Sequence, residues 1–148
     1  MSSGVKALLV VVGCLVLLGV ACGGFGIYWW SKNGQGLIES GKKAFEGGRE
    51  FGVQTDNRGC LDESIIKLKK AQGIGDHIQV GIFLRTCLDA SRETPGFCEG
   101  VPQPTEFTRT AQWQVEECRK AGLANNQQCG QLFSQVQQYC GTRQSKSQ

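Results

Sequence analysis

The sequence predicts an all-α protein in which an N-terminal transmembrane helix precedes a small disulfide-stapled domain of two helical hairpins, about four helices. Three observations predict this fold. An uncharged apolar run near the N-terminus is long enough to span a bilayer. Further along, apolar residues recur at helical spacing, and no segment alternates in polarity for the length of a strand. Six of the eight cysteines follow the apolar run, and two pairs of them lie symmetrically about expected helix breaks.

The predicted span covers residues 7–30, between Lys6 and Lys32. A helix needs about 20 apolar residues to cross a bilayer, so this stretch is long enough. Its last three residues, Tyr-Trp-Trp at 28–30, carry rings that favour the headgroup level. We therefore expect an uncleaved signal anchor that makes the lipid bilayer a partner, with residues 1–6 as a short N-terminal tail.

Two alternatives for this segment stay open. One is a cleaved secretory signal with small residues before Cys22, although cleavage there leaves an apolar new terminus. The other is a lipoprotein that is acylated at Cys22 or Cys14. Gly19 and Gly23 have the small-xxx-small spacing of paired helices, which favours a homo-oligomer through the span. Against that, glycine is common in membrane helices generally.

Charge and cysteine usage disagree about which side of the membrane holds the C-terminal domain. Basic residues follow the span within about 20 positions, and the positive-inside rule would place them in the cytoplasm. Six cysteines in the soluble part instead favour an oxidising compartment. We give the cysteines precedence and expect a single-pass protein whose C-terminal domain is extracytoplasmic, either periplasmic or extracellular.

Residues 31–58 are rich in glycine and predict a juxtamembrane neck between span and domain. A helix is the second interpretation, because Gly41, Ala44, Gly48 and Gly52 recur as on one close-packed helix face. Each glycine costs a helix about 1 kcal/mol relative to alanine. We therefore expect a helix here only where it packs against another element.

The disulfide-linked domain is predicted over residues 59–141 and begins with a hairpin. Gly73-Ile74-Gly75 separates its two helices, and Asp76 is expected to be the N-cap of the second. The expected buried face of the first helix is Leu61, Ile65, Leu68 and Ala71. That of the second is Val80, Phe83, Leu84, Cys87 and Leu88.

A proline-containing loop, residues 93–104, leads to the second hairpin. Thr105 is the expected N-cap of its first helix, and Asn125 or Asn126 that of its second. Gly141 is expected to close the last helix, and residues 142–148 are predicted to be a disordered tail. The expected inward face of the first helix is Phe107, Ala111, Val115, Cys118 and Gly122. That of the second is Cys129, Leu132, Phe133, Val136 and Cys140.

The six cysteines favour one pairing scheme among the 15 that are combinatorially allowed. Residues equidistant from the turn of a helical hairpin lie opposite one another. Cys60 and Cys87 are equidistant from the first break, as Cys118 and Cys129 are from the second. The favoured scheme joins each of these pairs and leaves Cys98 with Cys140. The alternative scheme joins Cys87 to Cys98 and Cys60 to Cys140, and buried free thiols in a cytosolic domain are the third interpretation.

Nucleic-acid, metal and catalytic functions have little support in the sequence. The 16 Lys and Arg and 13 Asp and Glu are nearly balanced, whereas phosphate binding needs clustered positive charge. His77 is the only histidine and no Cys-x-x-Cys occurs, so zinc spacings are missing. No serine or carboxylate pair has a catalytic setting. We expect no enzyme activity, no cofactor, no metal and no nucleic-acid partner.

An interaction role fits the last hairpin better. Gln131, Gln135 and Gln138 give its final helix a neutral hydrogen-bonding face, and Trp113 is a candidate contact anchor. The alternative is a solvated polar face with Trp113 folded onto the domain edge. The expected function is a structural or protein-interaction subunit of a cell-envelope assembly, with other membrane or envelope proteins as partners. A small-ligand or lipid-binding module is the alternative function.

Overall fold

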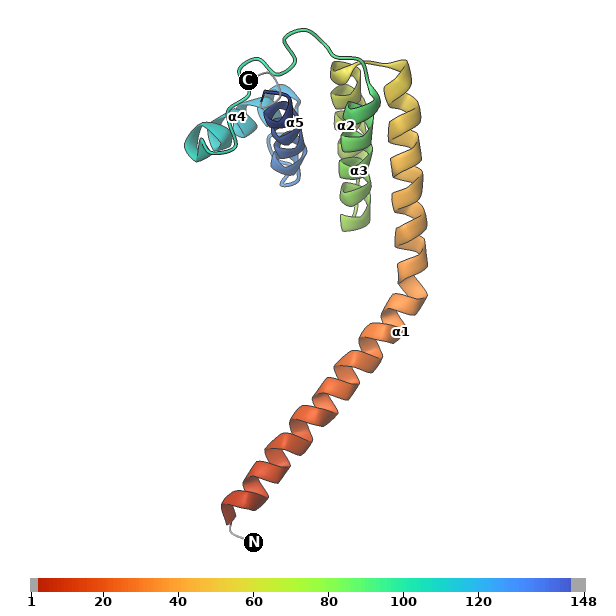
Figure 1. The fold of residues 1–148 in the computed structure, drawn as a ribbon, viewed down its shortest axis with the longest axis vertical. Helices are drawn as coiled ribbons and strands as arrows, with labels where there is room; N and C mark the ends of the chain where they lie inside the picture. The colour runs from red at the N-terminus through yellow and green to blue at the C-terminus, as the bar shows by residue number, and fades with distance from the viewer. Residues whose placement is uncertain (1–2, 145–148) are drawn as a thin grey trace. The chain divides into compact units, whose positions relative to one another are not determined.

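The computed structural model describes residues 3–144, which form five helices and no strand (Figure 1). This is the all-α class that the sequence predicts. The helices are α1 (Ser3–Gln54), α2 (Asn57–Lys70), α3 (Ile74–Ala90), α4 (Phe107–Lys120) and α5 (Cys129–Gln144). The chain divides into two compact units between Glu39 and Ser40, within α1.

The first unit contains the apolar part of α1. Its segment Val11–Tyr28 is long and apolar enough to cross a membrane, with a mean hydropathy of 2.2 and no part buried within the chain. A signal sequence near the N-terminus has the same features. The side chains of Trp29 and Trp30, which the sequence assigns to a membrane interface, lie outside the described residues. Cys14 and Cys22 are exposed and unbridged.

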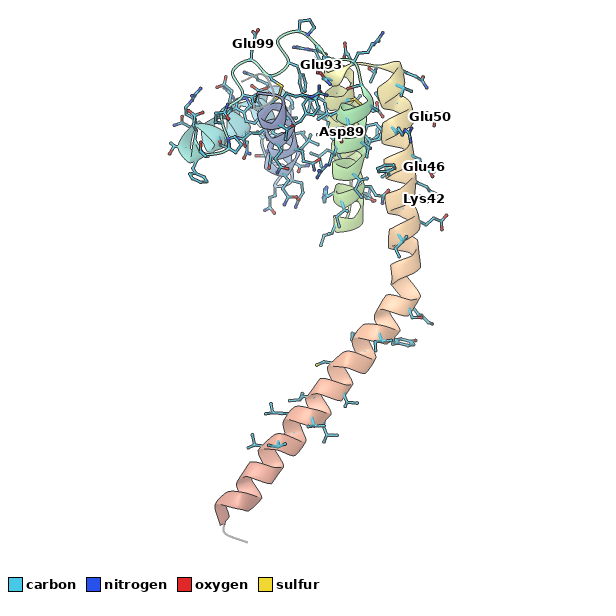
Figure 2. The ribbon with its side chains drawn as sticks, viewed as in Figure 1. Lys42, Glu46, Glu50, Asp89, Glu93 and Glu99 are labelled. Atoms are coloured by element: carbon cyan, nitrogen blue, oxygen red, sulfur yellow. A yellow bond between two sulfur atoms is a disulfide. The ribbon has the colours of Figure 1, made fainter. Side chains whose placement is uncertain are left out.

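The second unit begins with the C-terminal part of α1, which packs against α3 (Figure 1). Residues 40–54 therefore take the helical alternative rather than forming an irregular neck. Contact occurs at glycines, because a Cβ on Gly48 would lie 2.6 Å from the Phe83 carbonyl oxygen, and one on Gly52 would lie 2.7 Å from that of Cys87. The expected condition for a helix here, that it packs against another element, is met. Lys42 and Glu46 pair on its exposed surface at 3.9 Å (Figure 2).

The first hairpin consists of α2 and α3. Asp56 is the N-cap of α2 and accepts a hydrogen bond from the Gly59 amide at 2.9 Å. The expectation that Asp76 caps α3 is wrong, because Gly73 is the N-cap and Asp76 is the third helical residue. The Asp76 carboxylate accepts hydrogen bonds from the amides of Gln72 and Gly73, at 2.9 and 3.3 Å. The Gly-Ile-Gly sequence thus ends the turn and also starts α3.

The second hairpin begins later than the sequence predicts. The N-cap of α4 is Glu106 rather than Thr105, and its carboxylate accepts a hydrogen bond from the Gln103 amide at 2.8 Å. Gly122 ends this helix with a left-handed φ of 70°. The Leu123 amide then donates to the Cys118 carbonyl at 2.8 Å, as in a Schellman motif.

Helix α5 departs from the prediction at its C-terminal end. Asn126 accepts a hydrogen bond from the Gln128 amide in the turn before α5, which begins at Cys129. Gly141 is not a C-cap: α5 continues through it to Gln144, and the glycines with left-handed φ are elsewhere. Residues 142–144 are therefore helical, and the rest of the expected disordered tail, residues 145–148, lies outside the described residues.

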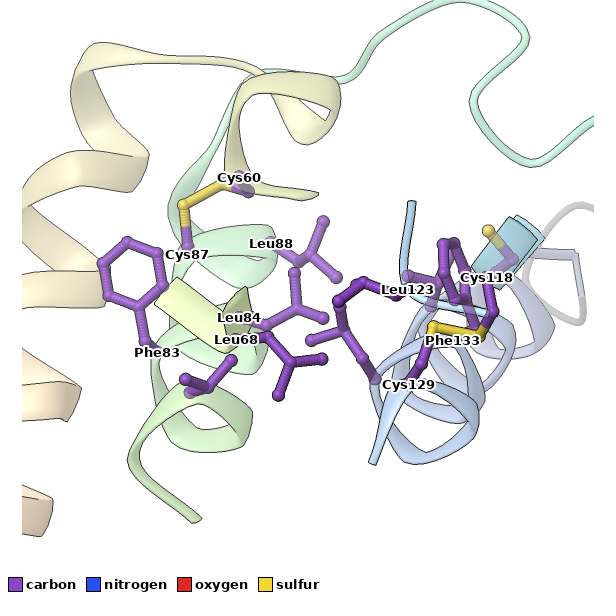
Figure 3. Close-up of a cluster of buried hydrophobic side chains, with 14 residues drawn as sticks. Cys60, Leu68, Phe83, Leu84, Cys87, Leu88, Cys118, Leu123, Cys129 and Phe133 are labelled. Carbon is purple, nitrogen blue, oxygen red and sulfur yellow. A yellow bond between two sulfur atoms is a disulfide. The ribbon is translucent and has the colours of Figure 1, made fainter. Parts of the chain in front are cut away.

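Both hairpins bury their apolar faces in one core (Figure 3). Leu84 and Leu88 of α3 face Leu123 and Phe133 of the second hairpin. Every residue expected on the buried faces of α3 and α5 is buried. Three disulfides hold this core together and match the pairing favoured from the sequence: Cys60–Cys87, Cys98–Cys140 and Cys118–Cys129.

The expected inward face of α4 is largely wrong. Of its members, Cys118 is buried, but Phe107 and Val115 are 81% and 70% exposed. The helix instead turns Trp113 toward the core. Because successive residues of a helix are about 100° apart, its inward face is rotated by roughly 100° about the helix axis from the expected face. The buried Gln137 contributes to this orientation, because its Nε2 donates to Thr110 Oγ1 of α4 at 2.7 Å and to the Pro102 carbonyl at 3.0 Å.

Candidate interaction surface

The structure separates Trp113 from the glutamines with which the sequence grouped it. Trp113 is half-buried and meets the Phe133 ring edge-on, with ring centroids 5.7 Å apart. It thus belongs to the contact between α4 and α5. This arrangement corresponds to the alternative in which Trp113 folds onto the domain edge.

The three glutamines do share one surface, a groove of about 640 Å³ between α3 and α5. Gln131 and Gln138 are exposed along its rim, and Gln135 is half-buried. Gln135 lies close against α3, where its Nε2 would be 2.7 Å from a Cβ on Gly81. The absence of a side chain at Gly81 therefore makes room for the Gln135 amide.

The opposite wall of the groove carries isoleucines that the sequence analysis missed. Ile74, Ile78 and Ile82 repeat every four residues on α3 and line the groove. Ile74 is 79% exposed and Ile78 is 50% exposed. The four-residue spacing was visible in the sequence. It was overlooked because the stripe from Val80 to Leu88 already gave α3 a complete buried face.

Two polar atoms in the groove have no partner among the described residues. They are His77 Nδ1 and Gln135 Oε1, both of which are buried. Arg85 is the one Lys, Arg, Asp or Glu side chain in the described lining. The groove thus combines an apolar ridge with unsatisfied hydrogen-bonding groups and little charge. This chemistry suits an uncharged protein surface better than an ionic ligand.

A second groove, of about 720 Å³, lies between α2, α3 and the C-terminal part of α1. Phe51 and Phe83 form its aromatic floor, with ring centroids 5.8 Å apart. The Lys67 ammonium group lies 4.7 Å from the centroid of the Phe83 ring and 3.2 Å from the Glu63 carboxylate. This groove is therefore apolar at its base and charged at its rim.

The outer side of α4 carries an apolar stripe that no other described part of the chain covers. It consists of Phe107, Ala111 and Val115, which are all exposed and repeat every four residues. The other side of this helix is held to α5 by the Cys118–Cys129 disulfide and the Trp113–Phe133 contact. The stripe is a further apolar surface that remains open on the domain.

No group of three or more His, Cys, Asp or Glu side chains within the described part of the chain is placed to hold a metal ion. No family model, curated protein or solved structure matches the chain.

Proposed function

We propose that this chain is a single-pass, membrane-anchored protein whose disulfide-linked domain lies outside the cytoplasm and serves as a structural or protein-interaction subunit of a cell-envelope assembly. The apolar helix supports the anchor. The three disulfides support an oxidising compartment, because thiols are kept reduced in the cytosol.

The α3–α5 groove carries the interaction part of this proposal. Its exposed isoleucines lose contact with water when a partner binds, which stabilises a complex by about 25 cal/mol per Å² of apolar surface. The exposed side chains of Gln131 and Gln138 offer hydrogen bonds that a partner can complete. An apolar wall beside hydrogen-bonding side chains gives a partner both kinds of contact that protein interfaces use.

Position-specific photocrosslinking in intact membranes tests this role. A photoreactive amino acid replaces Gln131 or Gln138 on the groove, or Glu99 in the exposed loop as the matched control (Figure 2). The groove positions are expected to give a discrete protein adduct that the Glu99 position does not. Equal adducts from all three positions, or none from the groove, would contradict the interaction role.

A small-ligand or lipid-binding module is the second candidate, favoured by the aromatic floor of the α1–α2–α3 groove. Native mass spectrometry of the gently purified chain separates the two functions. A bound small molecule that is lost in Phe51→Glu supports the ligand-binding module, and a chain free of small molecules contradicts it. The intact mass also shows whether the N-terminal segment is cleaved, or acylated at Cys22 or Cys14.

A further inference from the structure

We infer that the occupant of the α3–α5 groove is a second copy of this chain, which inserts the outer apolar stripe of its α4. The inference rests on the proposed interaction function and names the partner at the same groove. It joins two of the apolar surfaces that the domain leaves open, the isoleucine wall of α3 and the stripe of Phe107, Ala111 and Val115.

The two surfaces match in length and period. Ile74, Ile78 and Ile82 repeat every four residues, as do the three residues of the α4 stripe. Each set extends over nine residues of helix, so its first and last residues are about 12 Å apart along the axis. An amphipathic helix that lays such a stripe into an apolar groove is a common mode of protein recognition.

The arrangement requires two copies because α4 cannot turn its stripe into the groove of its own chain. Its inner side is bonded to α5 through Cys118–Cys129 and packed there through Trp113. Phe107 and Val115 consequently face solvent. Turning them toward the groove of the same chain would break this contact.

Charge does not oppose the docking of like chains at this contact. The charged side chains along α4 pair locally: Arg109 with Glu106 at 2.6 Å, and Lys120 with Glu117 at 2.9 Å. Arg119 lies 3.9 Å from Glu116. On the groove side, Arg85 is the one Lys, Arg, Asp or Glu among the described lining residues. Two chains of net charge +3 can therefore meet here without placing unpaired like charges together.

The area suits a membrane-tethered pair. The stripe exposes on the order of 300 Å², so docking against an equal groove area removes about 600 Å² from water. A two-fold pair makes this contact twice and buries about 1,200 Å², at the lower limit for stable interfaces. Confinement of both copies to one membrane raises their effective concentration and favours the pair.

A charge swap between the centres of the two stripes tests the pairing. Ala111 and Ile78 are the middle residues, so they come together whether the two helices run parallel or antiparallel. The full chain is reconstituted in lipid vesicles, and dimer formation is measured by energy transfer between labelled copies. A Gly19→Leu/Gly23→Leu background is expected to weaken association through the span.

Ala111→Glu and Ile78→Lys are each expected to weaken dimerisation at least about tenfold, because each places an unpaired charge in an apolar contact. The Ala111→Glu/Ile78→Lys chain is expected to recover it by pairing the charges. Gln112→Glu, an exposed change beside the stripe, is the matched control and should leave dimerisation unchanged. Helix content and the three disulfides establish that each variant is folded.

Wild-type dimerisation in either single variant, or no recovery in the combined variant, would overturn the inference. The photocrosslinks from Gln131 separate this failure from that of the proposed function. A groove that crosslinks to another protein in a monomeric chain overturns self-docking and leaves the interaction role standing. A groove that crosslinks to no protein contradicts both.

Discussion

At the residue scale, two glycines determine how closely α1 approaches α3. Gly48 and Gly52 are buried against the Phe83 and Cys87 carbonyl oxygens, where any side chain would collide with backbone. A Cβ on Gly47, the neighbour of Gly48, would meet nothing within 4 Å. The same residue type therefore permits close packing at one position and only weakens the helix at the next.

Alanine substitutions separate these two effects. Gly48→Ala is expected to destabilise the packing of α1 by about 1–3 kcal/mol, because the new methyl group overlaps α3. Gly47→Ala is the matched control and is expected to stabilise the helix by up to about 1 kcal/mol. The denaturant midpoint of the full chain, with hydrogen exchange over residues 40–54, measures both. Equal midpoints for the two variants would show that α1 does not pack closely on α3.

The Asp76 carboxyl group, at the start of α3, makes the stability of the fold depend on pH. Hydrogen bonds from the backbone amides of Gln72 and Gly73 lower the pKa of its carboxyl group below the ordinary 3.8. A carboxyl group whose pKa is lowered by folding stabilises the fold above its unfolded-state pKa. That contribution is lost as the pH falls through the lowered value.

Asp76→Asn is therefore expected to lower Tm at pH 7, where the wild-type carboxylate is charged. The two proteins should converge as the pH falls through the lowered pKa of Asp76, because both side chains are then neutral. Circular-dichroism melting curves from pH 2 to pH 7 follow this difference. A Tm difference that is the same at both ends of the range would mean that the carboxylate charge contributes nothing.

At the element scale, α4 is oriented by its attachments rather than by its apolar content. Phe107, Ala111 and Val115 predicted one face, and the structure turns Trp113 inward instead. The Cys118–Cys129 disulfide and the hydrogen bond from Gln137 to Thr110 both act from α5. Helical periodicity within α4 contains no information about these contacts with another helix.

The two faces of α4 are expected to respond differently to substitution. Trp113→Ala should destabilise the domain by about 2–3 kcal/mol, somewhat below the loss for a fully buried Trp, because it removes the contact with Phe133. Val115→Ser should change the stability of the monomeric chain by no more than about 0.5 kcal/mol, since Val115 is exposed in the single chain. Urea unfolding of the full chain measures the stability of both variants. A larger loss of stability in Val115→Ser than in Trp113→Ala would show that the face expected from periodicity is the buried one.

The disulfides are expected to contribute in the order of the chain length that each one closes. Their sequence separations are 11 for Cys118–Cys129, 27 for Cys60–Cys87 and 42 for Cys98–Cys140. Loop-closure entropy predicts losses of about 3 kcal/mol for the shortest and about 4 kcal/mol for the longest when both cysteines become alanine. Denaturant unfolding of the three paired variants ranks them. The opposite order would show that native contacts outweigh chain entropy.

At the scale of the whole molecule, repeated patterns were predictable and contacts between elements were not. The apolar run, the buried faces of α3 and α5 and the symmetric cysteine pairs are regularities within one helix or one hairpin. The sequence predicted a helix over the C-terminal part of α1 only if that part packs against another element. It did not identify α3 as that element, because glycine spacing does not identify the partner helix. The isoleucine wall was missed because one buried face already accounted for α3.

For the candidate surface, too, the pattern within one helix was predictable and the contact with another helix was not. The sequence placed Gln131, Gln135 and Gln138 on one face of a helix, and the structure brings all three to one groove. It could not show that α3 supplies the opposite wall, or that Trp113 is taken up by the contact with Phe133. Both depend on how the two hairpins pack together.

Non-reducing peptide mapping of the chain, alkylated as it is extracted from membranes, tests the central proposal most directly. A membrane-anchored domain in an oxidising compartment is expected to give three linked peptide pairs, Cys60–Cys87, Cys98–Cys140 and Cys118–Cys129. Cys14 and Cys22 should be recovered as free thiols, with any acylation visible as added mass. Six alkylated thiols in the domain would contradict the account and place the domain in the cytoplasm.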